Sequence, residues 1–265
     1  MHIIVPVKQV PETNSVRMDP DTGTMIRSGA ETVVNPLDLY AVEAALRLKE
    51  RYGGRVTAIS MGPPPAESAL REVVSMGCDD AVLLSDRRFG GSDTWATSYT
   101  LARAIAHLGS WDLVVTGERA TDGDTGQVGP GIAAWLDRPI ATYVAHMPQL
   151  REQRITVERL VEEGYQRITI STPAVLTVVK EIAVPRLPSL AGKRRARQIT
   201  IPVLGIDDLD LDQSNVGLNG SPTRVVKISS PTVARAGERI VVTDDNLVES
   251  VDRIVAFLQT REIIP

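Results

Sequence analysis

The chain has 265 residues, of which 43% are hydrophobic and 23% charged, and its formal net charge is -4. This is enough to bury one full core, with residues left over for an arm or tail. The acidic balance offers no general surplus of positive charge, which argues against nucleic-acid binding.

Cys78 is the single cysteine. The sequence therefore excludes an internal disulfide, a CxxC redox pair and a cysteine-based iron–sulfur or zinc site, and it favours a reducing compartment. MHIIVPVKQVPE at the start lacks the pattern of a signal peptide, and no run of 18 apolar residues could span a bilayer. We therefore expect a cytoplasmic protein without direct membrane insertion. Its histidines are isolated and no nucleophile motif is present, so no metal site and no catalytic residues are expected.

Short apolar runs alternate with segments of helical period through the first half of the chain, a pattern typical of a doubly wound, mostly parallel sheet. Polar and apolar residues alternate in RITVERLVEEGYQRITISTPAVLTVV (154–179), which predicts a late β hairpin that extends the sheet. The expected strands are 3–7, 55–61, 80–85 and 112–117, and the expected helices are 38–51, 66–77, 94–109 and 131–136.

The composition changes beyond Pro185. PRLPSLAGKRRARQ is proline-rich and basic, the stretch after it is acidic, and helical period returns only at 244–260. We therefore expect a nucleotide-binding α/β domain at 1–185, and a partner-docking arm with a C-terminal helix at 186–265, the arm being extended as far as residue 240.

Apolar and basic side chains follow one another in this arm. An exposed leucine next to positive charge suits an anchor with electrostatic steering, although a solvated basic face explains the charges as well. The docking residues proposed on this basis are Leu187, Leu190, Lys193, Arg194 and Arg195.

Three predicted loops leave the carboxyl ends of predicted strands, where ligands bind in open α/β sheets. They are VKQVPE (7–12), MGPPP (61–65) and ERATDGDTGQVGP (118–130). The third mixes glycines with short polar residues ahead of a helix, which suits a pyrophosphate held by backbone N–H groups. It is neither GxGxxG nor GxxxxGK[ST], so a purely structural loop remains an alternative. FGGSDT (89–94) is either a further binding loop or an N-cap turn, with Ser92 or Asp93 as the cap.

Together these segments resemble the beta subunit of electron transfer flavoproteins. VKQVPE, NPLDLYAVEAALRLKE, ISMGPP, SMGCDDAVLLSD, TGERATDGDTGQVGP and STPAVLTV occur in the family's order and spacing, so the resemblance covers essentially the whole chain. It implies an adenine nucleotide alpha hydrolase-like fold and a heterodimer with an alpha subunit. It also implies that a partner flavin dehydrogenase or quinone reductase docks on the arm, with Leu190 as the anchor.

The resemblance leaves the nucleotide of this subunit open between FAD and a structural AMP. DRRFGGSDTWATS (86–98) is similar to the Arg-x-Phe-Gly-Gly-x-Asp-Thr segment of the bifurcating group, which favours FAD, with NADH as electron donor. Glu118-Arg119 and Trp95 depart from the family pattern. A stand-alone ATP-binding regulatory domain of the universal-stress type is a third hypothesis, and the long arm argues against it.

The resemblance also assigns cofactor contacts. Phe89 and Gly90 would lie near the flavin and the nicotinamide, and Thr94 and Thr97 would contact the FAD phosphates or ring. The full set is Pro6, Val7, Lys8, Asn35, Asp38, Met61, Gly62, Pro63, Phe89, Gly90, Gly91, Asp93, Thr94, Thr97, Ala120, Asp122, Gly123, Asp124, Thr125, Gly126, Gln127 and Val128.

Overall fold

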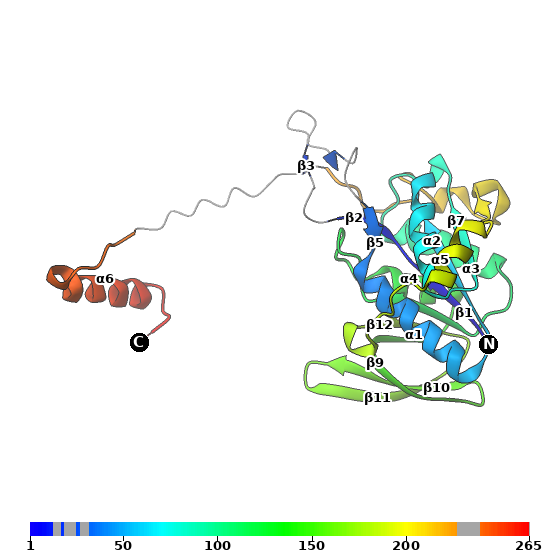
Figure 1. Cartoon of the computed structure of the whole chain (residues 1–265). Coiled ribbons are helices and arrows are strands. Elements are labelled where there is room, and N and C mark those ends of the chain that lie inside the picture. Colours follow the sequence, from blue (N-terminus) through cyan, green and yellow to red (C-terminus); the bar gives the residue numbers. More distant parts are fainter. Residues whose placement is uncertain (13–16, 19–24, 27–31, 227–238, 265) are drawn as a thin grey trace. The chain divides into compact units, whose positions relative to one another are not determined.

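The computed structural model describes residues 1–12, 17–18, 25–26, 32–226 and 239–264 (Figure 1). The chain forms two compact units, Met1–Lys227 and Ile228–Pro265. The first unit contains a nine-stranded sheet in the order β11-β10-β9-β12-β8-β1-β6-β7-β13. All neighbouring strands in it are parallel except where β10 pairs with β9 and β11. The predicted mostly parallel α/β fold is thereby confirmed.

The elements of this unit follow the expected alternation. The strands of the large sheet are β1 (His2–Pro6), β6 (Arg55–Met61), β7 (Asp80–Leu84), β8 (Leu113–Gly117), β9 (Ile140–Arg151), β10 (Arg154–Val161), β11 (Gly164–Ser171), β12 (Ala174–Val178) and β13 (Val203–Leu204). The helices are α1 (Pro36–Tyr52), α2 (Glu67–Met76), α3 (Thr94–His107), α4 (Val128–Leu136) and α5 (Leu190–Gln198). Four short strands form two further pairs, β2 (Gln9–Pro11) with β5 (Thr32–Val34) and β3 (Arg17–Met18) with β4 (Met25–Ile26).

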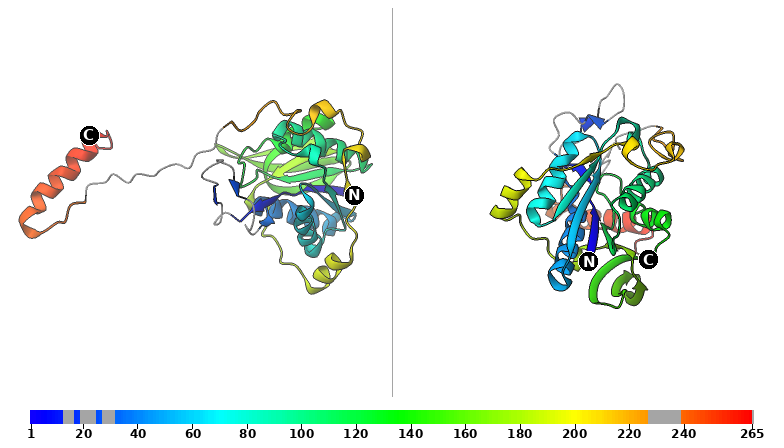
Figure 2. Two further views of the ribbon diagram at one scale, coloured as in Figure 1. Left: turned by 90° about the horizontal axis from the view of Figure 1, so that it is seen from above. Right: turned by 90° about the vertical axis from the view of Figure 1, so that its right-hand side faces the viewer.

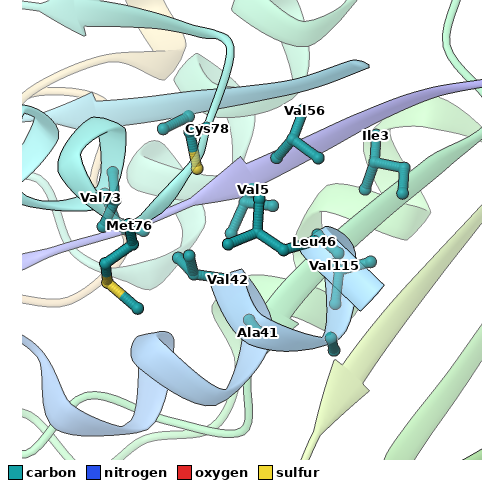
Figure 3. Packing of buried hydrophobic residues seen from close by; sticks show 14 of the residues in the cluster. Ile3, Val5, Ala41, Val42, Leu46, Val56, Val73, Met76, Cys78 and Val115 are labelled. Atoms are coloured by element: carbon teal, nitrogen blue, oxygen red, sulfur yellow. The ribbon is translucent and has the colours of Figure 1, made fainter. Parts of the chain in front are cut away.

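Helices cover both faces of the sheet (Figure 2). An apolar core lies between the helices and the sheet on each face. Ile3 and Val5 of β1 belong to the core beneath α1 and α2, while Ile4 belongs to the core beneath α3 and α4. Figure 3 shows side chains of β1, β6 and β8 meeting those of the two helices in the first core, with the buried Cys78 among them. Strands covered on both faces account for the continuous apolar runs in the sequence.

The late hairpin is present as β10 and β11, which pair antiparallel from Arg154 opposite Ser171 to Val161 opposite Gly164. The long strand β9 joins this hairpin to the parallel part of the sheet, because it pairs antiparallel with β10 and parallel with β12. The prediction that the hairpin extends the sheet is therefore confirmed.

The stretch after Pro185 differs from the extended arm that the sequence predicts. It contains the helix α5 and the strand β13, which pairs with β7, and residues up to 227 belong to the first compact unit. Arg71 of α2 donates hydrogen bonds to the carbonyls of Ala196 and Ile199, and Arg195 donates to those of Cys78 and Asp79. These long-range contacts hold a segment whose own sequence is too polar to indicate a packed helix.

The second unit contains the helix α6 (Leu247–Thr260), close to the predicted 244–260. Several of its apolar side chains are exposed, among them Leu247, Val248, Ile254 and Phe257. Among the described residues, no helix is both long and apolar enough to cross a bilayer.

Helix α4 approaches the sheet so closely that Gly129 has no room for a side chain. A Cβ there would lie 2.5 Å from Thr177 Cγ2 and 2.9 Å from Thr116 Oγ1, both on buried side chains. We expect Gly129→Ala to lower the free energy of unfolding by about 1–3 kcal/mol, because either α4 or the two threonines must shift. Urea unfolding of the full chain measures this.

Gly123→Ala is the matched control, since a Cβ at Gly123 would have no neighbour within 4 Å. It should change the stability by less than about 0.5 kcal/mol. Equal stabilities for the two variants would contradict the close approach of α4.

Candidate functional site

The start of α1 connects the loops that follow β1 and β8. Asn35 is 0% exposed, and its side-chain amide donates to the carbonyl of Arg119 at 2.9 Å and accepts from the N–H of Thr121 at 3.2 Å. Its backbone N–H donates to the carbonyl of Lys8 at 2.8 Å. Pro36 occupies the first helical position, where a missing N–H costs nothing. Asn35 therefore fixes both loops relative to the helix.

Asp38, in the first turn of α1, makes the second connection. Its Oδ2 accepts the backbone N–H of Lys8 at 2.8 Å, and a Cβ at Gly117 would lie 2.6 Å from its Oδ1. Gly117 is thus the residue that allows the carboxylate to reach the end of β8. Burial raises the pKa of Asp38 to about 7, although hydrogen bonds from Lys8, Asn35 and Gly117 oppose that change.

The charged side chains of these loops neutralise one another. Lys8 Nζ lies 2.7 Å from Asp122 Oδ1, and Arg119 pairs with both Glu118 and Asp124. All of them are at the surface, so the ion pairs are weak in water.

The glycine-rich loop 118–130 presents backbone donors ahead of α4. Within the described part of the chain, the N–H groups of residues 125–129 donate no hydrogen bond to another residue. Asp124 and Gly126 have positive φ angles of 54° and 63°, which turn the loop sharply. Gly123, Asp124 and Thr125 are exposed. Free amides at the start of a helix form a cradle for a phosphate, so the loop fits the group that the sequence predicts.

The loop 89–94 begins α3 beside this cradle. Asp93 is its N-cap, because Oδ1 accepts the N–H of Ala96 at 3.1 Å, which confirms the cap proposed from the sequence. Thr94 Oγ1 donates to Gln127 Oε1 at 2.8 Å and so joins the two loops. Gly90 and Gly91 are exposed, whereas Phe89 is only 5% exposed and packs in the second core. Its ring is therefore part of the core beneath the loop, and its expected place near the flavin and the nicotinamide stays a prediction.

The remaining predicted residues lie at the same edge of the sheet. Pro6 and Val7 are buried, so that only their backbone could face a ligand, and Val7 N–H donates to the carbonyl of Ile59 at 2.8 Å. Partly exposed positions at the edge are Met61, Gly62, Thr97, Ala120 and Val128, and Pro63 is exposed.

Tyr143 is a neighbour that the sequence analysis missed. It has a φ of 56°, its side chain is 47% exposed, and its N–H donates to Thr177 Oγ1 at 3.0 Å. Its hydroxyl would lie 4.0 Å from a Cβ at Gly126. A positive φ at a tyrosine gives no sequence signal, because it is imposed by the irregular pairing of β9.

A hollow of about 470 Å³ lies at the opposite edge of the sheet, lined by Met1, His2, Gly54, Arg55, Ser110, Trp111 and Asp112. These residues stand before or at the amino-terminal ends of β1, β6 and β8. Ligands of open parallel sheets bind at the carboxyl ends, so the glycine-rich loops, and not this hollow, form the candidate site. In the described ranges, no cluster of three or more His, Cys, Asp or Glu side chains could hold a metal ion.

The proposed docking residues lie on and before α5. Leu187 and Leu190 are each 88% exposed, and Lys193 and Arg194 are also exposed. Arg195 differs, because its guanidinium donates to the backbone of Cys78 and Asp79 and thereby fixes α5 to the domain.

The parallel sheet and its glycine-rich edge define a doubly wound α/β protein. A model of the electron transfer flavoprotein domain matches residues 22–209. The electron transfer flavoprotein subunit beta of Thermoanaerobacterium thermosaccharolyticum is 47% identical over 265 residues, 100% of both chains. Subunit CarD of the caffeyl-CoA reductase-Etf complex of Acetobacterium woodii is 45% identical over 265 residues, again 100% of both. Protein FixA of Azorhizobium caulinodans is 41% identical over 269 residues, 99% of this chain and 95% of that protein. The chain belongs to the electron transfer flavoprotein family, as a beta subunit, and the predicted resemblance is confirmed.

The buried Asp38 predicts a pH dependence of stability. Its pKa is raised to about 7 in the folded chain, whereas an unfolded aspartate titrates near 3.9. Between these values the folded state binds a proton that the unfolded state has lost, so this group's contribution to stability is full below about pH 4 and is lost as the pH rises to about 7.

We therefore expect Asp38→Asn to gain stability relative to the parent chain as the pH rises, by at most about 1.4 kcal/mol per pH unit between about pH 4 and 7. Urea unfolding of both proteins at several pH values measures the difference, in which the other titrating groups cancel. A difference that stays constant over this range would refute the raised pKa.

Proposed function

We propose that this beta subunit binds FAD at the carboxyl edge of its sheet and accepts a hydride from NADH, passing electrons to a second FAD in an alpha subunit and on to a partner dehydrogenase or low-potential acceptor. This is the function of an electron-bifurcating subunit, and it requires no acid or base from the protein. The site residues bind and orient the cofactor, and the bound flavin supplies the redox chemistry.

The hydrogen bond between Thr94 and Gln127 carries the choice of FAD over AMP. It joins the loop 89–94 to the phosphate cradle at a distance of 2.8 Å. The polar surface therefore continues from the phosphate cradle to the exposed glycines Gly90 and Gly91. AMP would leave the second loop unused, while a dinucleotide is long enough to reach both.

The residues of the edge take separate roles in this proposal. The free N–H groups of residues 125–129 bind phosphate oxygens at the start of α4, where the helix dipole favours negative charge. Asn35 and Asp38 hold the loops in position from behind. Asp122 restrains the ammonium of Lys8 at the rim.

Similarity to the relatives supports assembly with other chains. One relative is named as a subunit of a caffeyl-CoA reductase-Etf complex. In this chain two exposed leucines, Leu187 and Leu190, could anchor a partner dehydrogenase by apolar contact. The positive charges of Lys193 and Arg194 follow them in sequence and would steer the partner toward them. We expect the assembled protein to be cytoplasmic.

An ordinary electron carrier with AMP in this subunit is the second candidate. It is favoured by the burial of Phe89, since this ring is packed in the core and leaves less aromatic surface for a flavin. A stand-alone ATP-binding regulator finds no support, because the family match extends over both the loops and α5.

The nucleotides of the assembled protein decide between the two candidates. We expect co-expression with the alpha subunit to give a heterodimer from which acid releases two FAD, identified by absorbance and mass. Added NADH should bleach the flavin absorbance. One FAD with one AMP would refute FAD binding by this chain and leave the ordinary carrier.

The buried amide of Asn35 supports the nucleotide through the loop 118–121. Asn35→Ala leaves the carbonyl of Arg119 and the N–H of Thr121 without their partners, a loss of about 1–3 kcal/mol. We expect the heterodimer to bind its beta-subunit nucleotide about 5- to 150-fold more weakly, the change in affinity that this loss corresponds to, measured by equilibrium dialysis. Gln166→Ala, which removes an exposed side-chain amide on the hairpin strand β11, should have no effect. Equal losses of nucleotide affinity in both variants would contradict a specific role of Asn35 in the site.

A further inference from the structure

The segment Val216–Thr223, here called the latch, crosses the loop 89–94 from more than 120 residues away in sequence. Leu218 N–H donates to the carbonyl of Gly90 at 3.0 Å. The backbones meet so closely that a Cβ at Gly217 would lie 2.0 Å from the carbonyl oxygen of Arg88, and one at Gly91 would lie 3.0 Å from Leu218 Cβ. Val216 is buried in the second core and anchors the latch to the domain.

The latch makes three hydrogen bonds to Asp93. Its N–H donates to Ser221 Oγ at 2.8 Å, and its Oδ2 accepts both the N–H of Thr223 at 2.9 Å and Thr223 Oγ1 at 2.7 Å. Burial alone would raise the pKa of Asp93, but hydrogen bonds from Thr223 and from the N–H groups of Ala96 and Trp95 outweigh it and lower the pKa. The carboxylate is thus ionised at neutral pH, and bonds to an ionised acceptor are the strong ones.

Asp93 passes this restraint to the site. Its other oxygen, Oδ1, caps α3 through Ala96, and its carbonyl accepts the N–H of Thr97 at 2.9 Å. The next residue, Thr94, bonds to Gln127 at 2.8 Å. One carboxylate therefore connects the latch, the first turn of α3 and the side chain that joins the two loops.

We infer that Ser221 and Thr223 are positioning residues for the cofactor site: through Asp93 they hold the loop 89–94, and with it Thr94, in the geometry that receives the nucleotide. The inference rests on the proposed function. Neither residue lies in the loops 89–94 or 118–130, and Thr223 is 129 positions away from Thr94 in sequence.

Thr223→Val tests the inference, because it removes the hydroxyl donor and keeps the shape and the backbone N–H. In the assembled heterodimer we expect hydrogen exchange at the amides of Ala96 and Thr97 to become about tenfold faster, since their cap loosens. Retention of the beta-subunit FAD should fall about as much. Thr223→Ser keeps the hydroxyl and should restore both values.

Thr156→Val is the matched control. It removes a threonine hydroxyl from an exposed side-chain hydrogen bond to Thr169 on the hairpin, at 2.9 Å. It should leave both the exchange at Ala96 and Thr97 and the FAD retention unchanged.

Unchanged exchange at Ala96 and Thr97 in Thr223→Val would overturn the inference, and so would faster exchange with fully retained FAD. A parent heterodimer that contains AMP in place of FAD would refute the proposed function instead. In that case the hydrogen exchange at Ala96 and Thr97 alone would test whether the latch restrains the start of α3, because this measurement needs no flavin.

Discussion

The carboxyl edge of the sheet depends on the buried first turn of α1. Asn35 and Asp38 lie out of water, yet each takes part in hydrogen bonds with loop backbone: the N–H groups of Thr121 and Lys8 and the carbonyl of Arg119. Burying a polar group without a hydrogen-bond partner raises the free energy of the fold by far more than a buried hydrogen bond lowers it. Moving the loops away would leave these buried side chains without hydrogen-bond partners, at a high cost in free energy. One arrangement of the edge is therefore strongly preferred over others.

The position of this turn follows from the strand order. From β1 the chain proceeds to β6 and β7 on one side, then crosses to β8 on the other, so the order reverses between β1 and β8. Such a switch point leaves a crevice at the carboxyl ends, because the loops of the two strands diverge to opposite faces. Asn35 and Asp38 bind the loops of these two strands. The crevice that the topology creates is therefore also the place where these two buried side chains hold the loop backbone.

The sequence predicted those elements that depend on the local pattern of residues. Apolar runs located the parallel strands β1, β6, β7 and β8, and alternation located the hairpin. Asp93 was one of the two caps that the sequence allowed, with Ser92 as the other. Contacts between distant segments gave no such signal. Helix α5 buries only Ala196 and is held by arginine contacts to α2 and the turn after it, so neither its period nor its composition indicates packing. The family resemblance places Phe89 near the flavin, and only its neighbours in space show that its ring packs in the core.

The charge pattern of the edge decides which groups are left to bind a phosphate. Lys8 is paired with Asp122, and Arg119 is paired with Glu118 and Asp124. Both cationic side chains therefore already have carboxylate partners in the loop 118–130. What is not occupied, among the described residues of this edge, is the row of backbone N–H groups at residues 125–129. Backbone dipoles fixed by a folded loop need no reorganisation to meet an anion, whereas mobile side-chain charges must first leave their partners and lose conformational freedom. In the proposed site, recognition of the nucleotide therefore depends on loop geometry more than on charge. This explains why the holding residues, Asn35 and Asp38, are buried behind the loop and contribute nothing to its exposed surface.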